Sequence, residues 1–160
     1  MLENWKSNLV RMEENSRLIS GLVEHTLKML ENGSHSESPV RYRSVIRNAN
    51  TLKMAWTRRT STLQGFVPAV ISSDVHFGES FDRIMGGNTA VEHGLDILAS
   101  AGWPRTSMSG ISSIRTRAAE ILALLLRQVE REQSLLLLMS RQHLAARHSE
   151  AMVLSELVPS

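Results

Sequence analysis

The C-terminal third of the chain contains 48 consecutive residues, 111–158, without a single proline or glycine. Apolar residues recur within this stretch every three or four positions, with polar interruptions at Glu132, His143 and Glu150. This spacing predicts one long helix over 111–157. Such a helix is roughly 70 Å long, about twice the diameter of a small domain, so a lone globule cannot cover it.

The long helix also carries leucines at adjacent positions, in the runs 124–126 and 135–138. Adjacent positions on a helix point about 100° apart, so each run is apolar around most of the circumference. We therefore expect other helices of the chain on one side and a second subunit on the other, and we predict a homo-oligomer. The three polar interruptions argue against a simple coiled coil. The predicted oligomer or partner interface consists of Leu125, Val129, Leu136, Met139, Val153 and Leu157.

Two further helices are predicted in the N-terminal half. Residues 2–32 show apolar spacing of three and four, and Gly33 provides a stop. Residues 39–64 repeat the pattern after Pro39, which suits a first helical turn. The linker 34–38 is short, so the two helices are expected to lie antiparallel.

The central segment 65–110 lacks a regular pattern. Pro68 interrupts the apolar run Phe66–Ile71, which favours a buried loop, while 79–85 and 89–101 are candidates for short helices. The predicted fold is therefore all-α: an antiparallel helical bundle with a long C-terminal helix and an irregular central segment containing glycine, serine and proline. The whole chain, 1–160, is expected to form a single domain.

The residues offer little support for catalysis. The chain contains no cysteine, which excludes disulfides, thiolate metal sites and cysteine nucleophiles. Its six histidines do not form an HExxH pattern or another common ligand spacing, and no phosphate-binding glycine motif or GxSxG elbow is present. We predict a protein that is not an enzyme, with no cofactor and no metal site.

The cellular location is constrained only weakly. The first 17 residues carry charges throughout, so no signal peptide is expected. The longest apolar runs fall far short of the ~20 residues that span a bilayer. These observations favour the cytoplasm, or the interior of a virion or other assembly, and they leave peripheral membrane contact open.

The second predicted helix is strongly basic. No acidic residue occurs between Glu37 and Asp74, whereas this interval contains six basic residues. Five of them are candidate phosphate contacts for RNA or DNA: Arg41, Arg43, Arg47, Arg58 and Arg59. The aromatic residues Tyr42 and Trp56 fall on the apolar seam and are expected in the core. The net charge of the chain is only +2, which limits the argument for nucleic acid.

Two functional hypotheses follow. The first is a structural or adaptor protein that self-associates through its helices within a viral, phage or secretion assembly. The chain is rich in leucine (21 residues), serine (21) and arginine (15), a composition that resembles that of small viral proteins encoded in an alternative reading frame. An ordinary arginine-rich helical protein would have the same composition. The second hypothesis is a small nucleic-acid-binding protein that uses the basic helix. The expected partners are proteins and further copies of the chain, and in the second hypothesis RNA or DNA as well.

Overall fold

The computed structural model describes residues 2–32, 39–71, 75–100 and 111–157, with side chains covered for 5–31, 43–68, 77–100 and 115–142. Five helices make up nearly all of this part of the chain, and it contains no strand. They are α1 (Leu2–Asn32), α2 (Pro39–Ile71), α3 (Val75–Gly86), α4 (Asn88–Ala99) and α5 (Ile111–Leu157). The predicted all-α fold is confirmed.

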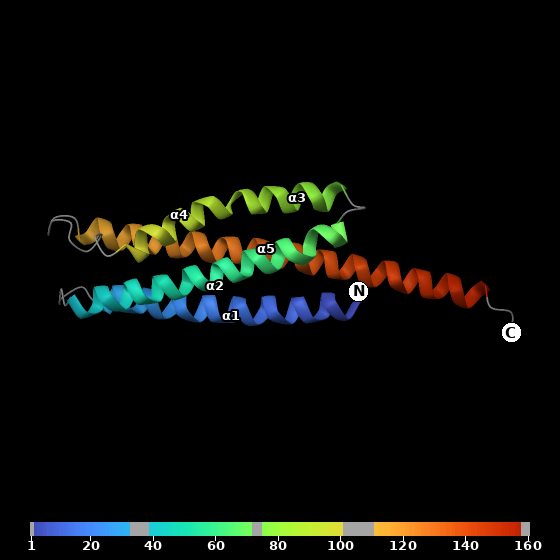
Figure 1. Ribbon diagram of the computed structural model, residues 1–160, viewed down its shortest axis with the longest axis horizontal. Coiled ribbons are helices and arrows are strands. Elements are labelled where there is room, and N and C mark those ends of the chain that lie inside the picture. The colour runs from blue at the N-terminus through green and yellow to red at the C-terminus, as the bar shows by residue number, and fades with distance from the viewer. Residues whose placement is uncertain (1, 33–38, 72–74, 101–110, 158–160) are drawn as a thin grey trace.

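The helices form an antiparallel bundle in which α1, α3 and α4 run in one direction and α2 and α5 in the other (Figure 1). Helices α3 and α4 follow one another in the same direction, so together they occupy one position of the bundle (Figure 1). Helix α1 packs against α2, α2 against α4, and α5 against α1, α3 and α4. Helix α5 then continues beyond the ends of the other helices (Figure 1).

The predicted bounds of the first and last helices are confirmed, whereas the middle of the chain differs. Helix α2 does not end at Gln64 but continues through Gly65 and Pro68 to Ile71. The side chain of Val67 is fully buried, and the ring of Phe66 packs edge-on against Trp5 with centroids 5.1 Å apart. Burial of Val67 and the packing of the partly buried Phe66 offset the helix-breaking effect of proline, which here lies only one turn before the helix ends.

The segment expected to be irregular therefore holds more helix than predicted. Helix α3 begins at Val75 rather than Glu79, and α4 covers Asn88–Ala99 rather than 89–101. The linker at 34–38 and residues 101–110, which include most of the Ser/Gly-rich stretch 106–113, lie outside the described residues.

Two apolar clusters fill the bundle, one toward each end. The larger surrounds Trp56 and includes Ile19, Leu95 and Leu122, each from a different helix. The smaller surrounds Met12 and Trp5 and includes Leu63, Phe81, Leu136 and Met139. Between them in sequence lie the buried residues Arg59 on α2 and Glu132 on α5, and the partly buried Ser16 on α1.

Helices α4 and α5 pack closely at Gly94 of α4. A Cβ atom at this position would lie 2.8 Å from Cγ2 of Ile121 on α5, closer than van der Waals contact allows. Gly21 of α1 differs, because no atom outside its own helix backbone would lie within 4 Å of an added Cβ. Close helix packing therefore favours glycine at position 94 but not at position 21.

Replacing each glycine with alanine tests this difference. Gly21→Ala is expected to raise the free energy of unfolding by about 0.5–1 kcal/mol, because alanine is the better helix former. Gly94→Ala gains the same helix propensity but forces Ile121 to move, so it should be less stable than Gly21→Ala by about 1–3 kcal/mol. Urea denaturation followed by circular dichroism measures both; equal stability of the two variants would contradict the packing described for α4 and α5.

Candidate interaction surface on the long helix

The centre of the bundle contains an ion pair between Arg59 of α2 and Glu132 of α5. The Arg59 side chain is 0% exposed and that of Glu132 is 1% exposed, and Nε of Arg59 donates to Oε2 of Glu132 at 2.5 Å. The Nη1 atom of Arg59 donates to the Met12 carbonyl oxygen at 3.2 Å and to Oγ of Ser16 at 2.7 Å. Gln133 of α5 also donates to Oγ of Ser16. One guanidinium therefore connects α1, α2 and α5.

A second polar contact extends this layer to α3 and α4. The side-chain amide of Gln128 on α5 donates to the carbonyl oxygen of Ile84 and, at 3.0 Å, to Oδ1 of Asn88. Gly87 lies between these two residues, and an added Cβ there would lie 2.7 Å from Oε1 of Gln128. The break between α3 and α4 is thus held against α5 by a glutamine whose side chain would have to shift if residue 87 carried a Cβ. We call these residues, Ser16, Arg59, Asn88, Gln128 and Glu132, the polar layer.

The carboxyl group of Glu132 has an unusual environment. Burial raises its pKa above the usual value of 4.5, and the charge and hydrogen bond of Arg59 only partly oppose this effect. Within the described part of the chain, Oε1 of Glu132 and Nη2 of Arg59 are buried without a hydrogen-bond partner. The pair therefore leaves part of its desolvation cost uncompensated.

The structure corrects the prediction that Arg59 contacts phosphate. Its guanidinium is enclosed by three helices and neutralised by Glu132, so it cannot reach a ligand outside the bundle. The sequence did contain a signal for this, because Arg59 lies three residues after Trp56 and four before Leu63, on the apolar seam. Glu132 lies on the seam of α5 in the same way, between Val129 and Leu136.

The other predicted phosphate contacts lie on the surface of α2. Arg43, Arg47 and Arg58 are exposed, and they share one face of the helix with Met54, which is 63% exposed. The side chain of Arg41 lies outside the described residues. Lys53, in the same basic segment, contacts Asp96 of α4 at 2.5 Å. The structure therefore keeps three arginines of the predicted set together on one exposed face.

The predicted oligomer interface requires a similar correction. Leu125, Val129, Leu136 and Met139 are all buried against other helices of the same chain, so in this bundle they are core residues and not available to a partner. The side chains of Val153 and Leu157 lie outside the described residues. The seam that was assigned to association is used for folding.

The leucine run on α5 divides between core and surface. Leu135 and Leu136 are buried, whereas Leu137 and Leu138 are 54% and 53% exposed. They lie just before the point at which α5 leaves the bundle, where Nε1 of Trp5 near the start of α1 donates to Oγ of Ser140 at 3.2 Å. Residues 141–157 continue the helix beyond this contact (Figure 1).

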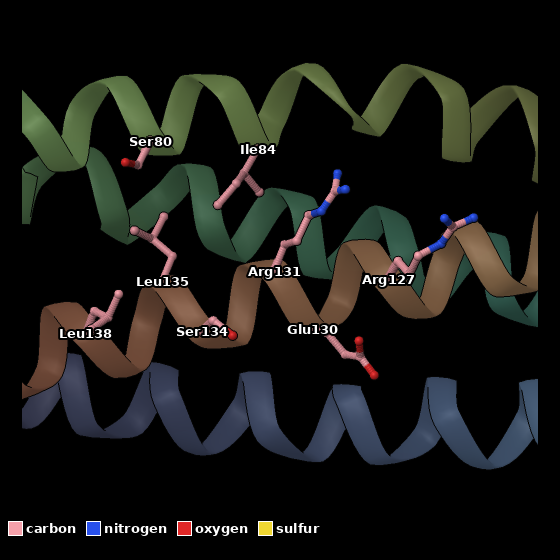
Figure 2. Close-up of a pocket in the computed structure, with 8 residues that line it drawn as sticks. All are labelled: Ser80, Ile84, Arg127, Glu130, Arg131, Ser134, Leu135 and Leu138. Atoms are coloured by element: carbon pink, nitrogen blue, oxygen red, sulfur yellow. The ribbon is translucent and has the colours of Figure 1, made fainter.

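A shallow groove of about 450 Å³ lies beside these leucines, between α3 and α5. Its apolar lining comes from Ile84, Leu135 and Leu138, and its polar lining from Ser80, Arg127, Glu130, Arg131 and Ser134. Figure 2 shows Arg127 and Arg131 extending from α5 toward the side of α3 and α4, whereas Glu130 extends toward α1. We refer to this feature as the α3/α5 groove; it combines an apolar base with two cations at its edge.

Neither chemistry nor comparison assigns a reaction to this surface. Among the residues that the structure describes, no three histidine, aspartate or glutamate side chains are grouped so as to hold a metal ion. No helix in the same residues is long and apolar enough to cross a membrane. Comparison with known proteins yields no matching family model, no matching curated protein and no matching solved structure.

The raised pKa of Glu132 has a measurable consequence for stability. Because the folded protein binds this proton more tightly than the unfolded chain, the contribution of Glu132 to the free energy of unfolding should increase as the pH falls through the folded-state pKa toward 4.5. Glu132→Gln retains an acceptor for Nε of Arg59 but does not titrate. The free energy of unfolding of the wild type, relative to that of Glu132→Gln, should therefore rise as the pH is lowered from 7.5 to 4.5.

Urea denaturation of the two proteins at several pH values measures this difference, and groups common to both cancel. A relative stability that falls with decreasing pH would show that the attraction to Arg59 outweighs burial, contrary to the expected direction.

Proposed function

We propose that this protein is a non-enzymatic structural or adaptor protein that self-associates through α5. The observation that carries the proposal is the pair of half-exposed leucines, Leu137 and Leu138, at the point where α5 leaves its own bundle. Adjacent exposed leucines beside a groove form the kind of apolar surface that marks an association site. In this role the bundle is a building block of a larger assembly, such as a virion, a phage particle or a secretion machine.

The length of α5 supports the same proposal. The segment 141–157 extends about 25 Å beyond the Trp5–Ser140 contact at the end of the bundle. A single helix that projects into solvent gains little from its own chain, because most helical stability in proteins comes from tertiary packing. Association with a second surface supplies the packing that the bundle does not.

Sedimentation velocity of the full chain at micromolar concentration tests the proposal. We expect a mass above that of the monomer, and a shift toward monomer in the variant Leu137→Glu/Leu138→Glu, because each carboxylate would have to be desolvated at the contact. Met54→Glu is the matched control, since Met54 is equally exposed but lies on α2. A wild-type protein that remains monomeric throughout, with the helical circular dichroism signal intact, would refute self-association.

A second function, binding to nucleic acid, is favoured by the exposed arginine face of α2. Arg43, Arg47 and Arg58 are spaced so that three side chains can reach phosphates along one backbone, and none of them forms an ion pair within the described residues. Oligomerisation would add avidity to such contacts.

A salt titration of binding to nonspecific RNA and DNA tests the second function. The triple variant Arg43→Ala/Arg47→Ala/Arg58→Ala should reduce the slope of log K against log salt concentration by about 2–3, since each phosphate contact releases close to one counterion. Replacement of Arg17, an exposed arginine on α1 that pairs with Glu13, should leave the slope unchanged. Absence of binding at low salt, or an unchanged slope in the triple variant, would eliminate this function.

A further inference from the structure

One face of α5 borders the α3/α5 groove and is exposed at the four positions that define it. Arg127, Arg131, Ser134 and Leu138 follow one another at spacings of four, three and four residues, so they lie in line on the helix surface. Three of them are exposed polar residues, and Leu138 is 53% exposed. Arg127 and Arg131 form no ion pair within the described residues. This face therefore offers two unpaired cations followed by an apolar position.

The same face continues past the end of the bundle. It passes between Arg141 and Gln142, both exposed, and then reaches the positions of Ala145, Ser149, Met152 and Glu156 by the same spacings of three and four. On this face the distal half carries one glutamate, Glu156, and no basic residue beyond Arg141, whereas the half beside the groove begins with two arginines; Glu150 lies on the core seam of α5. The two ends of this face therefore carry opposite charges, Arg127 and Arg131 at one end and Glu156 at the other.

From these observations we propose that two copies of the chain pair through this face of α5 in antiparallel orientation, with the two-fold axis between Arg141 and Gln142. The projecting end of each α5 then occupies the α3/α5 groove of the other copy. This proposal rests on the proposed self-association and specifies its geometry. It is isologous, so every contact occurs twice.

The register follows from the sequence positions. In an antiparallel pair centred between residues 141 and 142, opposed residues have numbers that sum to 283. Arg127 then faces Glu156 of the second copy, Arg131 faces Met152, and Leu138 faces Ala145. The first contact joins opposite charges, and the third places a small residue against an exposed leucine, which lets the helices approach closely.

Charge at the groove arginines and the shape of the groove favour this arrangement over a parallel pairing, whereas Arg141 of each copy lies beside its counterpart at the two-fold axis and opposes it. A parallel pairing of the same faces would place Arg127 against Arg127 and Arg131 against Arg131, which is unfavourable for like charges. The antiparallel contact runs over about 30 residues, or about 45 Å of helix. It also encloses the apolar base formed by Ile84, Leu135 and Leu138, which a single chain leaves open.

Charge reversal tests the pairing of Arg127 with Glu156. Arg127→Glu and Glu156→Arg, each alone, should weaken the dimer roughly 10-fold in sedimentation equilibrium, because the two-fold axis doubles each repulsive contact. The double variant Arg127→Glu/Glu156→Arg restores opposite charges at both contacts and should return the dissociation constant to within about 2-fold of wild type. Two independent effects that simply add would contradict the pairing.

Cysteine crosslinking tests the register directly, since the chain has no cysteine of its own. Ser134 and Ser149 have numbers that sum to 283, and serine to cysteine is a small change. An equimolar mixture of Ser134→Cys and Ser149→Cys proteins should form a disulfide-linked heterodimer on mild oxidation. Ser134→Cys alone should not, because its two copies would lie about 22 Å apart along the helix.

The outcomes separate the two proposals. A dimer in which the mixture crosslinks and Ser134→Cys alone does not supports the antiparallel pairing. A dimer in which Ser134→Cys crosslinks to itself, or in which neither reacts, overturns this pairing and leaves self-association in place. A protein that is monomeric in sedimentation overturns both.

Discussion

The buried contact between Arg59 and Glu132 is the constraint on which the arrangement of this bundle depends. Removing two opposite charges from water is costly, and attraction between them compensates only when their geometry is good and their remaining hydrogen-bonding groups are satisfied. Here the guanidinium also donates to Ser16 and to the Met12 carbonyl oxygen of α1. A shift of α1, α2 or α5 by one helical turn would separate these partners, and an unpaired buried charge costs about 3–5 kcal/mol. The contact therefore acts on the register of the helices more than on net stability.

The polar layer also explains the division of the core into two apolar clusters. Leucine and other aliphatic residues pack with little preference for one register, so a continuous apolar seam would allow the helices to slide. The layer interrupts the seam of each helix near the middle of the bundle. Gln128 fixes α3 and α4 against α5 in the same way, because it hydrogen-bonds to Ile84 of α3 and to Asn88 of α4. Each long helix is thus fixed against its neighbours at one polar level.

Helix α5 serves both the interior and the surface because of its periodicity. Glu132 points into the polar layer, whereas Arg131, one residue earlier, points about 100° away and borders the α3/α5 groove. Leu136 and Leu138 are divided in the same way between core and solvent. Once the contact with Arg59 has oriented α5, the face that remains outside is determined, and with it the face available to a second copy.

The sequence by itself determined the helices. Their bounds follow from proline, glycine and the three-to-four spacing of apolar residues, which are local properties, and α1 and α5 were predicted correctly from them. Local rules failed at Pro68, where burial of Val67 and the packing of Phe66 against Trp5 extend α2 past a residue that normally ends a helix. They failed again in assigning Arg59 to the surface and Leu125 to an interface, because a residue's exposure depends on which helices surround it. Spacing along one helix specifies which residues share a face, but only the packed bundle decides whether that face meets another helix or remains open.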